Sequence, residues 1–267
     1  MAKAAFNLPF GHPFSTSLGD CSMYTRRDSN KLVIRSKGGP SNEKIKNDPA
    51  FEKTRNQNSE FGGCSKAAKM MRDAIGTVGH LADVNLHAQA TKLISAIRAL
   101  DNNPKGKRSI IFSRGKQLIE GFNINKATSF DSVITSPIGF SINRNEHSAV
   151  LELPGITPGM NFNRVWTYPY YRIRINLGVI RDMVFVEGAG YKHVLKDVTG
   201  YTETLDTEWF QASSKTIGQE VGLTILDPVF DESCHLLLTL GIEFGTAADG
   251  EIKTIRHAGC AKILGMV

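Results

Sequence analysis

The chain has 267 residues, of which 41% are hydrophobic and 22% charged, and its formal net charge at pH 7 is +6. These values are ordinary for a globular protein with a sizeable core, and no apolar run approaches the roughly 20 residues of a membrane-spanning helix. The N-terminus lacks the continuous apolar stretch of a secretory signal, which predicts a cytoplasmic protein with no membrane partner. The four cysteines are scattered without a CxxC pair, so we expect mostly free thiols and no zinc site.

Positive charge is concentrated in the N-terminal third. Residues 1–108 contain 18 Lys+Arg and 9 Asp+Glu, whereas residues 109–267 contain 14 and 17. Such asymmetry can mark an anionic partner, nucleic acid above all. Alternatively, the basic part docks on an acidic surface of its own fold or of a neighbouring subunit. We favour the second interpretation, because no recognised nucleic-acid motif accompanies the charge.

Residues 1–40 predict an extended basic arm, because Pro, Gly, Ser and Asp recur there without apolar periodicity. Tyr24 lies among cationic residues, a pattern typical of a strand that follows phosphates. The arm's candidates for binding nucleic acid or another anion are Arg26, Arg27, Lys31, Arg35 and Lys37. A basic arm is also how assembling subunits hold a neighbour, so both interpretations stay open.

Residues 41–108 predict a helical region. Ser41 is placed to cap a short helix that Pro49 ends. A second helix is expected to begin at Ser65, after Gly62 and Gly63 stop a preceding turn. Residues 80–100 carry apolar side chains at three- and four-residue spacing, the strongest helical pattern in the chain. The polar linker "DNNPKGKR" then marks a domain boundary at residue 108.

The stretch "EFGGCSKAAK" (60–69) allows three interpretations. A helix N-terminus would offer free N–H groups to an anion, and a thiol placed there would be activated. We favour a glycine-rich turn with Cys64 or Ser65 near the cap, because the P-loop spacing and a partner base are missing. If an anion binds here, its candidate residues are Gly63, Ser65, Lys66, Lys69 and Arg72.

His80, Asp83 and His87 recur at a spacing that one helical face accommodates. We interpret them as exposed polar residues, since a metal site would need a further strong ligand and a dry pocket. The chain has no GxSxG, HExxH or GxGxxG motif in the required context, so we assign no catalytic residue, metal or cofactor.

Residues 109–267 change to a period of two, as in "YRIRINLGV" (171–179), "VGLTIL" (221–226) and "HLLLTLGIEF" (235–244). Many short alternating strands separated by turns predict an antiparallel β-sandwich, and the whole chain is expected to be α+β. The turn "TAADGE" (246–251) predicts a closing hairpin whose last strand is embedded in the sheet.

Four stretches together resemble a family of bacterial proteins of similar length. They read "IRSKGGPSNEKIKNDPAFEKTRNQNSEFGGCSKA", "KRSIIFSRGKQLIEGFNIN", "SFDSVIT" and "GEIKTIRHAGCAKILG". The resemblance implies that the helical and β parts belong to one unit. No activity is established for that family, so no functional residues carry over.

The leading hypothesis is a non-catalytic structural or interaction protein that forms a homo-oligomer through its arm and helices. The first alternative is a nucleic-acid-binding protein that uses the basic third, with affinity that falls steeply with salt. The second alternative is an enzyme with a cleft between the helices and the sandwich, which would contain strongly perturbed titratable groups.

Overall fold

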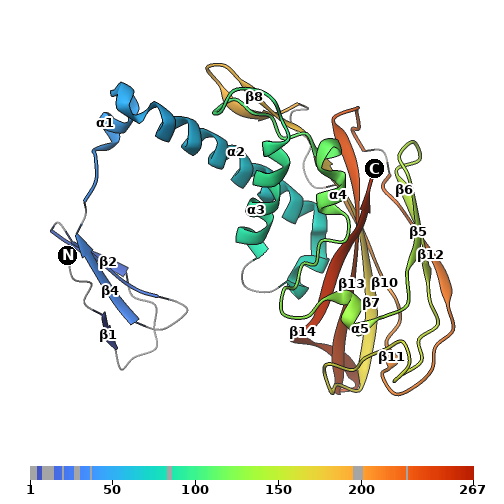
Figure 1. Ribbon diagram of the computed structural model, residues 1–267. Helices are drawn as coiled ribbons and strands as arrows, with labels where there is room; N and C mark the ends of the chain where they lie inside the picture. Colours follow the sequence, from blue (N-terminus) through green and yellow to red (C-terminus); the bar gives the residue numbers. More distant parts are fainter. Residues whose placement is uncertain are drawn as a thin grey trace. The chain divides into compact units, whose positions relative to one another are not determined.

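The computed structural model describes residues 5–7, 15–19, 21–26, 31–36, 38–82, 86–194, 201–226 and 228–267. Its chain forms two compact units, Met1–Arg55 and Asn56–Val267, which we call the N-terminal unit and the body (Figure 1). Helices occur together with antiparallel sheets, which confirms the α+β class. None of the helices in the described ranges is both long and apolar enough to cross a membrane.

The N-terminal unit contains a four-stranded antiparallel sheet where the sequence predicted an extended arm. Its strands are β1 (Ala5–Asn7), β2 (Ser15–Leu18), β3 (Cys21–Thr25) and β4 (Lys31–Ser36), in the order β1-β4-β3-β2. Helix α1 (Asn42–Asn47) and the 3-10 turn η1 (Pro49–Phe51) follow. The Ser41 hydroxyl accepts the amide proton of Lys44 at 3.2 Å, so the predicted cap is confirmed.

Helix α2 (Glu52–Ile75) runs without interruption through Gly62 and Gly63, so the predicted helix start at Ser65 is wrong. The physical reason is a tertiary contact. A Cβ atom on Gly63 would lie 2.6 Å from ring atoms of Tyr191, a residue from a distant strand. The absent side chain therefore makes room for an aromatic ring, and the packing that results overrides the low helix propensity of glycine.

The other helical elements are short except α3. They are η2 (Gly76–Leu81), α3 (Leu86–Ala99), η3 (Phe112–Gly115), α4 (Lys116–Ile119) and α5 (Phe130–Val133). Gly76 has φ +60°, a left-handed conformation that ends α2 and that glycine adopts at little cost.

The body contains ten strands in the ranges described. They are β5 (Gly139–Asn143), β6 (Ser148–Leu153), β7 (Tyr170–Arg181), β8 (Met183–Val186), β9 (Gly190–His193), β10 (Thr202–Asp206), β11 (Phe210–Gln211), β12 (Gln219–Thr224), β13 (Cys234–Ala248) and β14 (Glu251–Met266). The central sheet has the order β10-β7-β13-β14, and β11 also pairs with β7. A second sheet has the order β12-β6-β5, and β8 and β9 form a separate hairpin.

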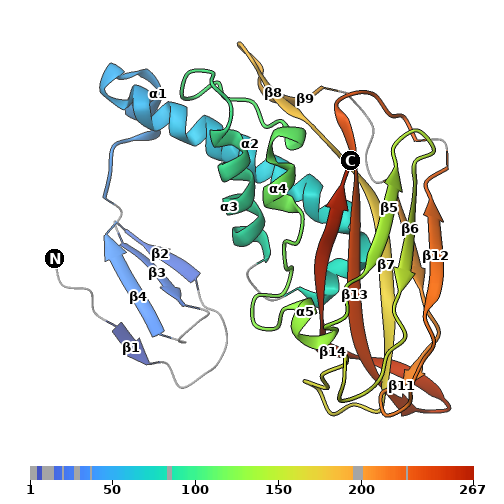
Figure 2. The same cartoon turned by 45° about the vertical axis from the view of Figure 1, so that its right-hand side comes forward.

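The two faces of the central sheet pack against different layers (Figure 2). Alternate residues of β7 and β13, such as Ile175 and Leu240, share one core with Leu151 of the second sheet. Leu237 and Ile263 point to the other face and share a second core with the helices. That second core joins the helices to the sheet. A single sandwich is therefore not confirmed.

The end of α2 and the following η2 rest directly on the backbone of the central sheet. A Cβ atom on Gly178 of β7 would lie 2.0 Å from the carbonyl oxygen of Ala74. A Cβ atom on Gly241 of β13 would lie 2.6 Å from the side chain of Leu81. Because Gly178 and Gly241 have no side chains, the end of α2 and η2 can lie close against the sheet, and we call these two residues the glycine seat. This brings the side chains of η2 to the end of the sheet that carries polar residues.

The predicted closing hairpin is confirmed. Strands β13 and β14 pair from Ala248 and Glu251 at the turn to Leu237 and Met266 at the far end. Asp249 and Gly250 at the turn have φ +54° and +83°. Positive φ at both central residues is the geometry that favours Asp-Gly in a two-residue hairpin.

Candidate functional site

The sheet of the N-terminal unit has two chemically different faces. Its register places Met23 opposite Ile34 and Tyr24 opposite Val33, and neighbouring pairs point to opposite faces. The face that we call apolar carries Leu18, Cys21, Met23, Leu32 and Ile34, together with the polar residues Thr16, Thr25 and Ser36. The basic face carries Ser22, Tyr24, Arg26, Lys31, Val33 and Arg35.

The apolar face has no covering layer in the described part of its unit. Leu18 is 70% exposed, and Met23 and Ile34 are only partly buried. No described side chain of the N-terminal unit is buried, whereas both faces of the central sheet in the body are covered. An apolar sheet face is normally packed against a second layer.

The basic face brings together three of the five arm residues that the sequence suggested, namely Arg26, Lys31 and Arg35. The guanidinium carbon of Arg35 lies 5.7 Å from the centroid of the Tyr24 ring. Arg35 Nε also donates a hydrogen bond to the hydroxyl of Ser22 at 3.2 Å. No carboxylate occurs among the described residues of these four strands. The remaining two candidates, Arg27 and Lys37, lie outside the described residues.

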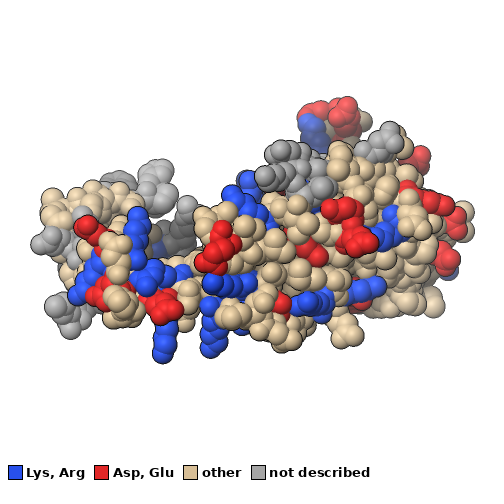
Figure 3. Space-filling model, turned by 90° about the horizontal axis from the view of Figure 1, so that it is seen from above, with Lys and Arg blue, Asp and Glu red and all other residues tan. Residues whose placement is uncertain are grey.

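The five candidates on α2 lie in the body instead. Gly63 is buried and Ser65 is partly buried, while Lys66 and Lys69 are exposed and Arg72 is partly exposed. Because α2 begins at Glu52, these residues are interior to the helix, and no helix N-terminus is present to bind an anion there. On the face shown in Figure 3, Lys and Arg side chains are interspersed with Asp and Glu.

Cys64 is a core residue of the body. Its side chain is fully buried, and burial raises the pKa of its thiol. A thiol that stays protonated in an apolar environment is a poor nucleophile. The arrangement therefore supports a packing role for Cys64.

The three residues that were considered as metal ligands do not form a described cluster. His80 lies in η2 and His87 in α3, while Asp83 lies outside the described residues. Across the described ranges, no group of three His, Cys, Asp or Glu side chains is arranged to hold a metal ion.

A charged cluster on the central sheet was missed by sequence reasoning. Glu243 of β13 is fully buried, and its carboxylate accepts hydrogen bonds from His80 at 2.6 Å and from Arg172 of β7. Arg174 of β7 lies 3.5 Å from the same carboxylate and also makes two bonds of 2.6 Å to Asp206 of β10. The sequence feature that could have revealed this cluster is a single glutamate inside an apolar strand, because a buried carboxylate needs cationic partners.

A second buried carboxylate ties α2 to the polar linker. Glu60 is 3% exposed, and Arg108 binds both of its oxygens at 2.7 Å. The amide of Gly106 donates to Glu60 at 2.8 Å, and Arg98 of α3 lies 3.1 Å away. The linker that the sequence suggested as a boundary is thus fastened to the helices of the body.

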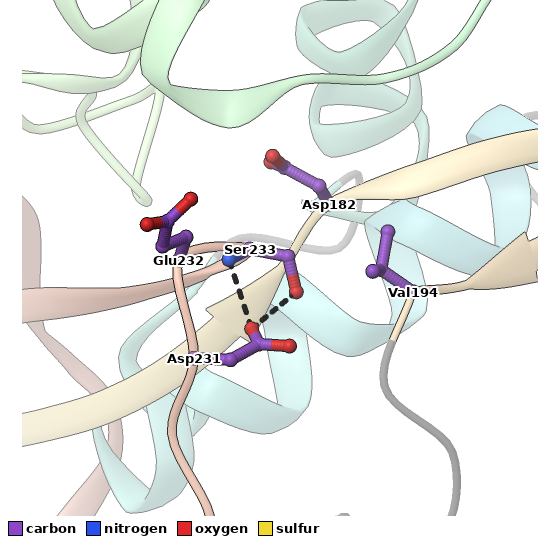
Figure 4. A pocket seen from close by; sticks show the side chains of 5 residues that line it. All are labelled: Asp182, Val194, Asp231, Glu232 and Ser233. Carbon is purple, nitrogen blue, oxygen red and sulfur yellow. Dashed lines mark hydrogen bonds between the residues drawn. The ribbon is translucent and has the colours of Figure 1, made fainter.

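A pocket of about 530 Å³ lies at one end of β7 (Figure 4). Its lining is mainly acidic, with Asp182, Val194, Asp231, Glu232 and Ser233. Asp231 accepts hydrogen bonds from the amide and hydroxyl of Ser233 at 2.8 and 2.6 Å, as the dashed lines show. Asp182 accepts the amide proton of Phe112 at 2.8 Å. Two of the three carboxylates are thus already bonded within the protein.

Comparison with known proteins assigns no function to these sites. No protein-family model, curated protein or solved structure matches the chain. Functional inference therefore rests on the residues and their contacts.

Proposed function

We propose that the chain is a non-catalytic structural or interaction protein that assembles with copies of itself through its N-terminal unit. The observation that supports this proposal is the apolar face of the N-terminal sheet, on which Leu18 is 70% exposed and Met23 and Ile34 are only partly buried. Burial of Leu18, Met23 and Ile34 against another copy would supply the missing layer and remove apolar surface from water. The two sheets of the body would act as a sandwich-like scaffold that carries this docking element.

Charge supports a second copy of the chain as the partner. Residues 1–55 contain 10 Lys+Arg and 5 Asp+Glu, whereas residues 109–267 contain 14 and 17. The N-terminal unit of one copy is therefore attracted to the strand region of another, and copies of the N-terminal unit repel one another. This favours head-to-tail contacts between copies.

The test compares two double variants on the same pair of strands. Met23→Glu with Ile34→Glu places two charges on the apolar face, and Ser22→Glu with Val33→Glu places the same charges on the opposite face. We expect the wild-type protein and the second variant to elute as a discrete oligomer by light scattering, and the first variant to be monomeric. A monomeric wild-type protein at micromolar concentration, or equal behaviour of the two variants, contradicts the proposal.

The basic face favours a second candidate function, the binding of single-stranded nucleic acid. Tyr24 offers a ring on which a base can stack, and Arg26, Lys31 and Arg35 on the same face can contact phosphates. Three such contacts predict that the logarithm of affinity falls with the logarithm of salt concentration with a slope of about −2.

Fluorescence anisotropy with a labelled single-stranded oligonucleotide measures this slope. The variant with Ser22→Glu and Val33→Glu should bind more weakly, since its new charges oppose the phosphates. Binding that is absent at low salt, or that does not change with salt, contradicts this second function. The same variant is expected to keep the oligomer, so the two proposed functions fail separately.

A further inference from the structure

His80 joins η2 to the central sheet through both nitrogens of its ring. Nδ1 lies 2.5 Å from the carbonyl oxygen of Thr77, and Nε2 lies 2.6 Å from a carboxylate oxygen of Glu243. The carbonyl oxygen only accepts hydrogen bonds, and so does the Glu243 carboxylate when it is ionised, so each ring nitrogen then has an acceptor for a proton. The geometry therefore fits the imidazolium form of His80.

Charged groups face His80 from two neighbouring strands, and a third strand completes the cluster. β13 contributes Glu243, and β7 contributes Arg172 and Arg174. β10 contributes Asp206, which binds both arginines. On β14, Gly259 pairs with Glu243 and is closely approached by Leu81, and the charged or titratable residues that precede it, Arg256 and His257, are exposed.

Within this cluster, the charge of the His80 ring is the one that can change at pH values near neutrality. Two guanidinium groups balance the two carboxylates, and arginine stays protonated throughout the physiological range. The hydrogen bond to Glu243 raises the pKa of His80 from its ordinary value of 6.5. Burial by itself raises the pKa of Glu243, but the bonds from His80 and Arg172 bring it below its ordinary value. Glu243 therefore stays ionised near neutrality.

We infer that His80 is a protonation-dependent latch that holds η2 on the central sheet. When the ring loses a proton, one nitrogen turns a lone pair toward an acceptor, and the attraction to Glu243 weakens. Segment η2 can change its conformation when this attraction weakens, because Gly76 at its start has φ +60° and Gly79 lies within it. The His80 side chain is 38% exposed, so it exchanges protons with solvent while the protein stays folded.

The sign of the effect follows from the raised pKa. The latch is fully closed below the ordinary histidine value and opens as pH rises through the raised value. Near pH 6 we expect η2 to be held, and near pH 9 we expect it to be loosened. The change is local, because Val78 and Leu81 keep their apolar contacts with the body.

Native-state hydrogen exchange tests the latch in the full chain. After correction for intrinsic rates, we expect protection of the amides in η2 to fall by about tenfold for each pH unit between the ordinary histidine value of 6.5 and the raised pKa, and to level off above the raised pKa. His80→Gln keeps one donor to Glu243 but cannot titrate, so its η2 should be weakly protected at both pH values. His87→Gln, at an exposed histidine of α3, should keep the wild-type response.

Two hydrogen-exchange results would overturn the inference. One is η2 protection that does not change with pH in the wild-type protein, and the other is a pH response that survives in His80→Gln. The ring of His80 in the wild-type protein gives a readout that does not depend on a variant. An NMR titration in which it loses its proton at or below 6.5 would also overturn the latch.

Discussion

Adjacent glycines in the middle of α2 should respond in opposite directions to the same substitution. A Cβ atom on Gly63 would lie 2.6 Å from two ring atoms of Tyr191 and 2.8 Å from a third. The ring is held in place, since its hydroxyl donates to the carbonyl of Arg108 at 2.7 Å and it forms a T-shaped contact with Phe185 at 5.5 Å between ring centroids. A Cβ atom on Gly62 would meet no heavy atom within 4 Å.

The expected magnitudes follow from these contacts. Alanine in a helix interior is favoured over glycine by up to about 1 kcal/mol, which is the gain expected for Gly62→Ala. Gly63→Ala has the same gain but adds overpacking of about 1–3 kcal/mol. Displacement of Tyr191 would also cost its hydrogen bond, worth about 1 kcal/mol. We therefore expect a net loss of about 1–3 kcal/mol for Gly63→Ala.

Urea unfolding followed by circular dichroism measures both changes. The midpoint should rise for Gly62→Ala and fall for Gly63→Ala, with unchanged slopes. Combining Gly63→Ala with Tyr191→Leu should reduce the penalty, because the flat ring is replaced by a smaller and more adaptable side chain. Equal effects at the two positions, or a stabilising Gly63→Ala, would refute the argument that the ring requires glycine.

Three further predictions concern the body. Glu60→Gln removes the buried carboxylate that pairs with two partly buried arginines and should lower the free energy of unfolding by about 3–5 kcal/mol, measured in urea; an unchanged midpoint would contradict the ion cluster. Deletion of residues 262–267 removes buried parts of β14 and should lower the melting temperature, so a soluble truncation that melts normally would rule out the embedded strand. Iodoacetamide should modify Cys64 only after unfolding, and rapid labelling of Cys64 in the native protein would show that it is not sealed in the core.

The sequence pattern predicted correctly those helices and strands that are determined by residues within the element itself. The closing hairpin follows from alternating residues and an Asp-Gly turn, and α3 follows from apolar spacing within residues 86–99. Gly63 was misinterpreted because its reason is Tyr191, which the local sequence cannot reveal. Similarly, Arg172 and Arg174 alternate with apolar residues as a solvent-facing row would, but the carboxylate that pairs with them comes from β13.

For the candidate site, the sequence identified the cationic residues of the arm but not their arrangement. Alternation within β4 predicts that Lys31 and Arg35 share a face, since they are four residues apart. The pairing of β3 with β4, which adds Tyr24 to that face and Met23 to the other, depends on contacts between strands. Periodicity shows which residues share a face but does not show what covers it.

The glycine seat under α2 has a consequence for the order in which the body folds. The seat is made by β7 and β13, so it exists only after two segments far apart in the sequence have paired. Helix α2 can form its own backbone hydrogen bonds earlier, but its apolar side has nowhere to dock until then. Non-local pairing of this kind slows folding and prolongs the lifetime of partly ordered species.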